Sequence, residues 1–258
     1  MFPLTHAYAI GRLVVEAGPL HLLGAIFPDA VLVNGLRWEQ THQAGAALHA
    51  YLAEHYPAGR PFAVGVISHG VSPQGLDYYG DQRYGPFERG YCFEEARPYA
   101  ARVAAICRLP ASMGLWKGHN FVEMALEWLL AQRDPALGRR VRQVLQEPAG
   151  LEELSPHLEA FFGPAGSPLG ESLPAMLPFL ALEPLTPQAL AERYQRQVRL
   201  KHGVETIDVP AAAAMIEEIA AAIQPRCWAF LEDVLGRIAA MLQQEEWAAG
   251  PQDPTHTP

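Results

Sequence analysis

The residues best suited to chemistry in this sequence are His119 and Glu123, in the segment GHNFVEMALEWLLAQR. The segment has the periodicity of an amphipathic helix, and residues four apart lie on the same helical face. An imidazole nitrogen and a carboxylate oxygen can therefore reach one point in space, which makes the pair half of a metal site. The same spacing also occurs by chance on ordinary surface helices, so a metal site requires further ligands from elsewhere in the chain.

Further candidate ligands precede this helix, each at or near the end of an expected helix. They are His6, Asp29, His42 and His69. Thr5 is expected to cap a first helix that continues to Gly18, and Pro28 is expected to turn the chain and present Asp29 at a helix end. His69 ends the apolar segment PFAVGVISH, whose small residues suit a buried helix packed closely against its neighbours. A buried imidazole needs a polar partner, and a metal ion is one.

The segment RWEQTHQAGAALHAYLAEHYPAG is expected to form one helix, with His42 near its start and His49 and His55 on its surface. Glu39 and His42 also have the Glu-x-x-His spacing of di-iron carboxylate bundles. Those bundles use two such motifs and two further glutamates, and this sequence has no second copy of the motif. An oxidative enzyme of the di-iron carboxylate type stays open as an alternative.

Residues 70–90 have the composition of a pocket wall, because glycines and tyrosines are interleaved with Asp77, Asp81, Arg83 and Arg89. Either aspartate can orient a metal-activated water or take its proton, and either arginine can hold a phosphate oxygen. The candidate catalytic residues are Asp77, Asp81 and Arg83. The neighbouring tyrosines can line a pocket for a leaving group. A tyrosine-rich surface loop is the plainer alternative.

The order of these motifs resembles the zinc-dependent phospholipase C family and, more distantly, the fungal single-strand nucleases that share its all-helical fold. The resemblance covers roughly residues 1–130. It rests on Thr5-His6, Phe27-Pro28-Asp29, Thr41-His42, Gly65-Val66-Ile67-Ser68-His69 with a following aspartate, and Gly118-His119-Asn120-Phe121-Val122-Glu123.

Members of that family hold a cluster of zinc ions between helices. The resemblance therefore implies that the metal ligands are His6, Asp29, His42, His69, His119 and Glu123. It also implies a metal-activated water that hydrolyses a small phosphodiester or a lipid head group. Imidazole and carboxylate ligands suit zinc, and iron or manganese are compatible with them as well.

The sequence departs from the family pattern in three respects, one of which is the absence of a His-x3-Asp motif. Pro73 stands where members often carry an aspartate one turn after the histidine, so Asp77 can act only if the loop folds back. Met1 has no evident processing signal, so the amino-terminal ligand of secreted members is not expected here. The remaining ligands predict one or two metal ions rather than a full cluster.

Composition narrows the classes of function. The chain has 258 residues, 50% of them hydrophobic, and a net charge of −9, which disfavours binding to duplex nucleic acid. Three separated cysteines exclude a disulfide framework. Neither a signal peptide nor an apolar run of roughly 20 residues is evident, so no transmembrane segment and a cytoplasmic location are expected.

Helical periodicity recurs along the whole chain and no alternating strand pattern appears, which predicts an all-α fold. We expect one multi-helical domain over residues 1–248, divided into a metal-site half at 1–131 and a helical scaffold or lid at 132–248 that could also form a homodimer surface. The segment AGSPLGESLPAMLPFLALEPL is the expected internal linker, and residues 249–258 are expected to be a disordered tail.

A different class of function remains open beside the metal-dependent hydrolase. A helical binding or interaction protein without catalytic activity would need none of the placements above. Bound transition metal in the purified protein separates the two hypotheses.

Overall fold

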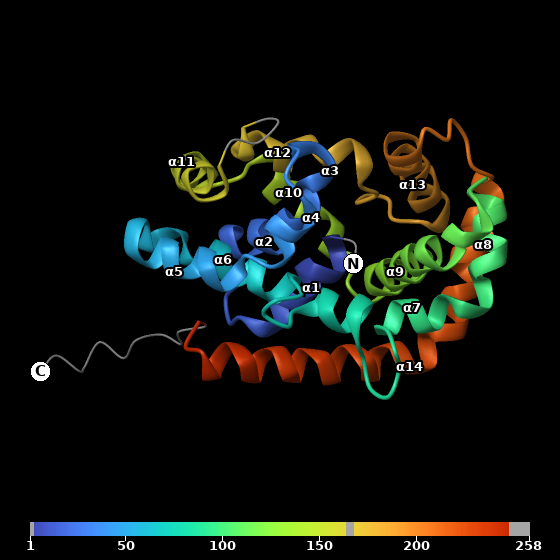
Figure 1. Cartoon of the computed structure of the whole chain (residues 1–258), viewed down its shortest axis with the longest axis horizontal. Helices are drawn as coiled ribbons and strands as arrows, with labels where there is room; N and C mark the ends of the chain where they lie inside the picture. The colour runs from blue at the N-terminus through green and yellow to red at the C-terminus, as the bar shows by residue number, and fades with distance from the viewer. Residues whose placement is uncertain (1–2, 164–167, 248–258) are drawn as a thin grey trace, which may run out of the picture.

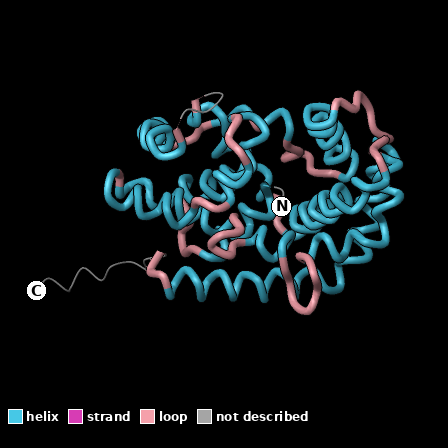
Figure 2. Tube along the Cα trace, in the orientation of Figure 1, coloured by secondary structure: helices cyan, strands magenta, loops and turns pink. Residues whose placement is uncertain are grey.

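The computed structural model describes residues 3–163 and 168–247 and is built from helices, with no strand in that part of the chain (Figures 1 and 2). The expectation of an all-α fold is confirmed. The α-helices are α1 (Pro3–Leu13), α2 (Pro19–Ile26), α3 (Val31–Asn34), α4 (Trp38–His42), α5 (Gly45–His55), α6 (Arg60–His69), α7 (Tyr91–Ala96), α8 (Ala100–Ile106), α9 (Gly114–Arg133), α10 (Leu137–Gln146), α11 (Leu151–Phe162), α12 (Leu169–Ala175), α13 (Pro187–His202) and α14 (Val209–Gln244).

Short helical turns connect several of these helices. The 3-10 turns are η1 (Phe27–Ala30), η2 (Pro57–Gly59), η4 (Arg97–Tyr99), η5 (Ala111–Met113) and η6 (Leu177–Phe179), and η3 (Tyr78–Gln82) is a π-helical turn. Single π-helical turns are rare and often occur at functional sites. In this chain the turn carries Asp81, and Asp77 immediately precedes it.

The core is continuous from one half of the chain to the other. Helix α9 passes through the interior, and the long helix α14 lies along one edge of the molecule (Figure 1). One cluster of buried apolar side chains extends from Leu4 in α1 to Leu242 in α14. Burial of this apolar surface is the main source of stability, so both halves of the chain depend on the same core.

Helices α2 and α6 approach each other closely because both carry glycine at the crossing. A Cβ atom on Gly24 would overlap the backbone of Phe62, and one on Gly65 would overlap the backbone of His21 and Ala25. The residues of α6 from Phe62 to His69 are all buried, as the small residues of this segment predicted. The close crossing brings the end of α6 next to the end of α2.

Two helix boundaries differ from the expectation. Helix α1 begins at Pro3, so Thr5 is buried inside it and does not cap it, and the helix ends at Leu13 rather than near Gly18. The segment expected as one helix is two, α4 and α5, because the chain breaks after His42. His42 therefore lies at the end of α4, and the axis of α5 does not determine where its side chain points.

Two further expectations on individual segments were wrong. The expected linker packs into the core, since α12 buries Leu169 and Leu173 completely. His49 is buried instead of exposed and lies 3.3 Å from Nε of Arg60. The tail at 249–258 lies outside the described residues. Within the described part, no helix combines the length and low polarity needed to cross a membrane.

Candidate metal centre

Asp77 lies at the centre of a buried group of histidines. Its Oδ2 atom is 3.4 Å from Nε2 of His42 and 3.2 Å from Nε2 of His69, and its Oδ1 atom is 3.3 Å from Nε2 of His6. The side chains of these residues are at most 3% exposed. Histidines from α1, α4 and α6 therefore converge on one carboxylate that is shielded from solvent.

Hydrogen bonds to the backbone determine the tautomers of two of these histidines. Nδ1 of His69 is 2.7 Å from the carbonyl oxygen of Ala25, and Nδ1 of His42 is 3.0 Å from the carbonyl oxygen of Trp38. A carbonyl only accepts, so Nδ1 must carry the proton and donate it. In the neutral imidazole, Nε2 then has a free lone pair, and in both residues Nε2 points toward Asp77. Metal-binding histidines characteristically donate the other ring N–H in this way.

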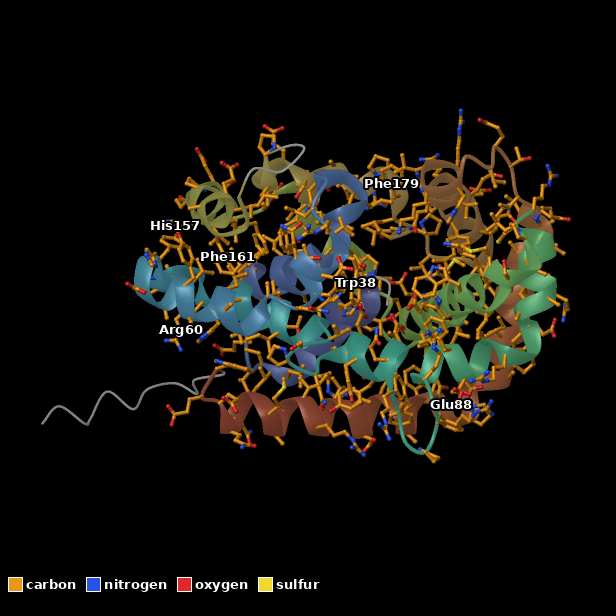
Figure 3. All side chains as sticks on the ribbon, viewed as in Figure 1. Trp38, Arg60, Glu88, His157, Phe161 and Phe179 are labelled. Carbon is orange, nitrogen blue, oxygen red and sulfur yellow. The ribbon has the colours of Figure 1, made fainter. Side chains whose placement is uncertain are left out.

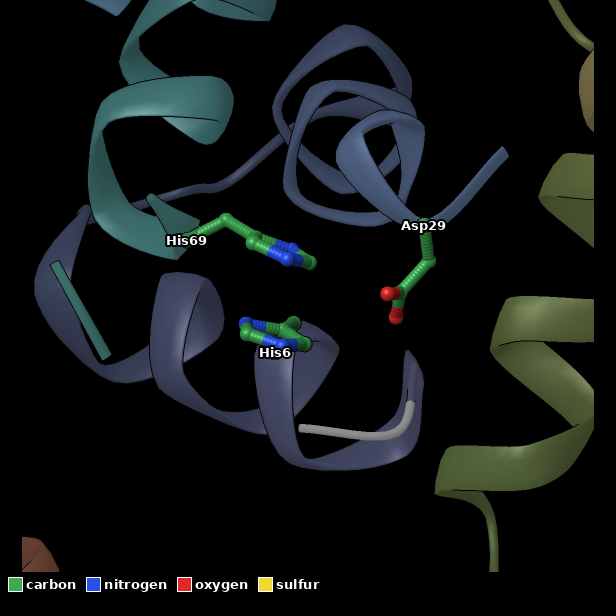
Figure 4. Close-up of side chains that lie close together, drawn as sticks. All are labelled: His6, Asp29 and His69. Carbon is green, nitrogen blue, oxygen red and sulfur yellow. The ribbon is translucent and has the colours of Figure 1, made fainter. Parts of the chain in front are cut away.

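Asp29 and His6 extend the same group on its other side. Figure 4 shows the rings of His6 and His69 lying parallel, with the carboxylate of Asp29 beside them. The two ring centroids are 3.4 Å apart and the ring planes differ by 8°. His6, Asp29 and His69 each offer a ligand atom within 4.8 Å of the others, as do His42, His69 and Asp77. His69 belongs to both sets.

Burial controls the protonation of this group. Loss of solvent lowers the pKa of His6 well below its ordinary value and lowers the pKa of His42, so both imidazoles are neutral at pH 7. The same loss of solvent raises the pKa of Asp29. Burial by itself would also raise the pKa of Asp77, but electrostatic interactions with His69 and His6 and the contact with His42 hold it well below its ordinary value. A carboxylate ringed by imidazoles is a donor set suited to a cation.

The loop after α6 folds back and so brings Asp77 to the histidines. The backbone N–H of Val71 donates to the carbonyl of His42 over 2.8 Å, and that of Gly75 donates to the carbonyl of Gly70 over 3.0 Å. A Cβ on Gly75 would collide with the backbone of α6, so this turn accommodates only glycine without rearrangement. Asp77 was expected to act only if this loop folds back. The loop does fold back, so Asp77 lies among the candidate ligands.

His119 and Glu123 converge as their spacing predicted, but the point where they meet holds an amide. Nδ2 of Asn120 is 2.9 Å from Nε2 of His119 and 3.1 Å from Oε2 of Glu123. Tyr194 donates to the amide oxygen of Asn120 over 3.1 Å and so orients the amide. Nδ1 of His119 is buried without a hydrogen-bond partner in the described chain.

Glu123 also belongs to a second group of potential ligands with Asp81 and Cys92, whose ligand atoms lie within 4.8 Å of one another. Burial raises the pKa of Asp81 well above its ordinary value, and Glu123 and Asp77 raise it further. Burial likewise raises the pKa of the Cys92 thiol, which keeps it protonated and a weak ligand. Oδ1 of Asp81 is buried without a hydrogen-bond partner in the described chain.

Both groups border one cavity of about 580 Å³. The polar residues that line it are Asp29, Glu39, His42, Asp77, Asp81, Gln82, Arg89, Lys117, His119, Asn120, Glu123, Tyr194, Gln197, Lys201 and His202. Trp38 belongs to the wall, stacks on the ring of His42 at 4.5 Å, and lies near the middle of the molecule (Figure 3). A cavity of this size can hold a small organic molecule.

Of the two arginines considered from the sequence, Arg89 lies on this cavity. Its guanidinium stacks over the ring of Phe93, with 4.3 Å between the guanidinium carbon and the ring centroid. Arg83 is exposed and lies outside the residues that line the cavity. The loop turns at η3, so that Asp81 points inward and Arg83 outward.

Helix α13 supplies a wall of the cavity that the sequence did not indicate. Tyr194, Gln197, Val198, Lys201 and His202 line it, and their spacing of three and four residues places them on one helical face. A scaffold or lid was predicted for this helix, because the later helices contain only His157 and His202 as histidines and both have polar neighbours in the sequence. Their position facing α9 depends on packing, which local sequence does not encode.

Lys117 was also missed. Lys117 is 5% exposed and lines the cavity. Its side chain makes no hydrogen bond or ion pair with the described part of the chain. Burial lowers its pKa to about 8, and the charge of Lys201 contributes to the shift. A lysine two residues before His119 could have been noticed, but its burial could not.

Comparisons with protein-family models, curated proteins and solved structures yielded none that matches this chain. The resemblance to zinc-dependent phospholipase C therefore remains a prediction from motifs.

Proposed function

We propose that this protein is a metal-dependent hydrolase of phosphodiesters or phospholipid-like esters. The observation that carries the proposal is the arrangement of His42 and His69 around Asp77. Both imidazoles donate Nδ1–H to a backbone carbonyl, and both direct Nε2 toward the same carboxylate oxygen.

A metal ion accounts for this arrangement better than the protein groups alone. In the neutral tautomers that the backbone carbonyls select, the two Nε2 lone pairs would face the carboxylate over 3.2 and 3.4 Å and repel it, and burial would strengthen the repulsion. Nε2 of His69 is buried and finds no hydrogen-bond partner in the described chain. A cation among these atoms would satisfy both imidazoles and the carboxylate together, and nitrogen and carboxylate donors suit zinc, iron or manganese.

The roles of the residues follow from their positions. His6, Asp29, His42, His69 and Asp77 would hold the ion. When bound, such an ion lowers the pKa of a water ligand and polarises a phosphoryl oxygen. In hydrolysis a bond forms from water oxygen to phosphorus, and the bond from phosphorus to the leaving oxygen breaks.

Acid–base chemistry would fall to Asp81, with Arg89 binding the substrate. Because burial raises the pKa of Asp81, this residue retains a proton that it can give to the leaving oxygen. Arg89 borders the same cavity and can hold a phosphoryl oxygen. The choice of a phosphodiester over other esters draws on the resemblance to the phospholipase C family and on this arginine.

Metal analysis is the first test. Protein stripped with a chelator and reloaded separately with zinc, iron or manganese should retain at least one ion per chain, measured by mass spectrometry of the metal. His69→Gln should weaken binding by roughly a hundredfold, because the loss of an outer partner of a ligand already costs 10–100-fold. The loaded protein should release p-nitrophenolate from bis(p-nitrophenyl) phosphate.

His55→Gln is the matched control, since His55 is exposed and its ring bonds to the carbonyl of Tyr51 in its own helix. It should keep metal and activity. Absence of bound transition metal in the reloaded protein would overturn the proposal and favour the helical binding protein. Equal metal loss in both variants would show that the binding is not at this centre.

A further inference from the structure

The cavity beside the candidate metal centre carries opposite charges on its walls. Asp29, Asp77 and Glu123 border it and interact electrostatically with Asp81 as their common neighbour, and the four carboxyl groups form its acidic side. Lys117, near the start of α9, and Lys201 and His202, at the end of α13, also border it and interact electrostatically with one another. The metal centre proposed above uses only the acidic side and leaves the basic residues without a role.

Lys117 is the residue whose position most requires an explanation. Burial of an ammonium group is costly unless a counter-ion accompanies it, and the described chain supplies neither an ion pair nor a hydrogen bond. The lysine also lies in the fourth position of α9, whose first turn has no acidic residue. The positive end of a helix dipole disfavours a cation and favours an anion.

Other residues nearby add positive charge instead of neutralising it. Lys201 and His202 follow one another at the end of α13 and face the same cavity as Lys117. Arg199, on the same last turn, is paired with Glu205 over 3.1 Å and does not line the cavity. Arg199, the cation of α13 that lies outside the cavity, therefore has an acidic partner. Lys117 of α9 borders the cavity and has none in the described chain.

We infer that Lys117, Lys201 and His202 form an anion subsite that binds a phosphate group of the substrate other than the one that is cleaved. This inference rests on the proposed hydrolase function and narrows its substrate class. Lys117 and Glu123 are six residues apart on α9, so the subsite lies on the order of 9 Å along the helix axis from the acidic side. The substrate is a phosphodiester with a second, terminal phosphate at about that separation.

The first experiment measures the subsite without catalysis. Inorganic phosphate is titrated into chelator-treated protein by calorimetry, and its effect on the melting temperature is recorded in parallel. Wild type should bind phosphate, and Lys117→Met should bind it at least tenfold more weakly, because a hydrogen bond to a charged group is lost. Lys201→Met should also weaken phosphate binding. Because Lys201 is exposed, this substitution should leave the protein folded, so misfolding would not explain the loss.

Arg199→Met is the control of equal charge, because it removes a cation from the same helix end but outside the cavity. It should bind phosphate like wild type. If Arg199→Met loses as much affinity as Lys117→Met, the effect is general electrostatics and the subsite does not exist. Unchanged phosphate binding in both lysine variants, or no binding by wild type, also overturns the inference.

The second experiment connects the subsite to hydrolysis by metal-loaded protein. Two substrates differ only in one group: hexyl p-nitrophenyl phosphate and its analogue with a terminal phosphate on the hexyl chain. Wild type should prefer the analogue at least tenfold in kcat/KM, and Lys117→Met should lose that preference while still cleaving the simple diester. Equal preference in wild type and variant contradicts the inference.

Together the two experiments distinguish failure of the subsite from failure of the hydrolase proposal. Phosphate binding that depends on Lys117, with neither ester cleaved, would retain the subsite and refute the hydrolase. Cleavage of both esters at equal rates, without phosphate binding, would retain the hydrolase and refute the subsite.

Discussion

At the scale of single residues, the site is defined by ionisable groups that burial keeps close together. His42 and His69 each donate Nδ1–H to a backbone carbonyl and direct Nε2 toward Asp77. The carboxyl of Glu127, four residues after Glu123, is buried in the same region and accepts a hydrogen bond from the backbone N–H of Leu4. These groups make stability depend on pH.

Glu127 provides a prediction with a definite sign. Burial raises its pKa from 4.5 to about 8. The native protein therefore keeps this proton at pH 7 while the unfolded chain releases it, so the unfolded state binds fewer protons. The free energy of unfolding should fall as pH rises from about 4.5 to 8 on account of this group. Glu127→Gln cannot ionise, so it should lose less stability over that window.

Urea denaturation of chelator-treated protein at pH 5.5 and pH 8 measures the difference. The buried histidines act in the opposite direction, because their lowered pKa values add stability as the pH rises, and they are common to both proteins. Glu152→Gln, at an exposed position of α11, should behave like wild type. An equal loss of stability in wild type and Glu127→Gln would show that burial does not raise the pKa of Glu127.

At the scale of elements, the close crossing of α2 and α6 positions the metal centre. His69 reaches the carbonyl of Ala25 because glycines at the crossing let the two backbones approach. The loop after α6 then returns Asp77 to the same place. The glycines are therefore as important to the site as the ligands.

Gly65→Ala tests this crossing. The added methyl overlaps the backbone of His21 and Ala25, so the helices must separate, which should cost about 1–3 kcal/mol of stability. Separation also moves His69 away from Ala25, so metal binding should weaken. Urea denaturation and metal titration measure the two effects.

Gly236→Ala is the matched change in an open position of α14, where a Cβ meets nothing within 4 Å. It should leave stability unchanged or raise it by about 0.5–1 kcal/mol, since alanine favours helix. If both alanine variants are equally stable, close packing at the α2–α6 crossing is not what constrains Gly65.

At the scale of the whole molecule, the two halves of the chain share one core and one cavity. Phe230 of α14 is buried and stacks on Tyr91 of α7 with ring centroids 4.0 Å apart. Helix α13 faces α9 across the cavity. The half expected as a scaffold or lid therefore contributes directly to the site.

A shared core predicts cooperative unfolding. Far-UV circular dichroism and tryptophan fluorescence should report one transition with one midpoint, because tryptophans occur in both halves. Phe230→Ala should lower that single midpoint, at a cost of about 3–5 kcal/mol. Leu200→Ala, at a side chain 56% exposed, should change it little. Two separate transitions would indicate independent domains.

The sequence predicted much of the fold and of the candidate site where the signal is local. Helical periodicity predicted the all-α class, and the apolar segment with small residues predicted a buried helix ending in His69. His6, Asp29, His42 and His69 were chosen by residue type and by position near helix ends, and the structure brings them together. The prediction of a single helix across Arg37–Gly59 was wrong. The sequence has no strong helix breaker that would reveal the turn after His42.

Periodicity and residue type by themselves determined that this chain is helical and which histidines and carboxylates could serve as ligands, because both properties repeat over short segments. Only the tertiary structure decided that Asp77 lies among the histidines, that the Asn120 amide contacts both His119 and Glu123, and that Lys117 is buried at the same cavity. These facts depend on how distant helices pack and on the solvent they exclude. Burial changes the charge and the partners of a side chain, and no local pattern records it.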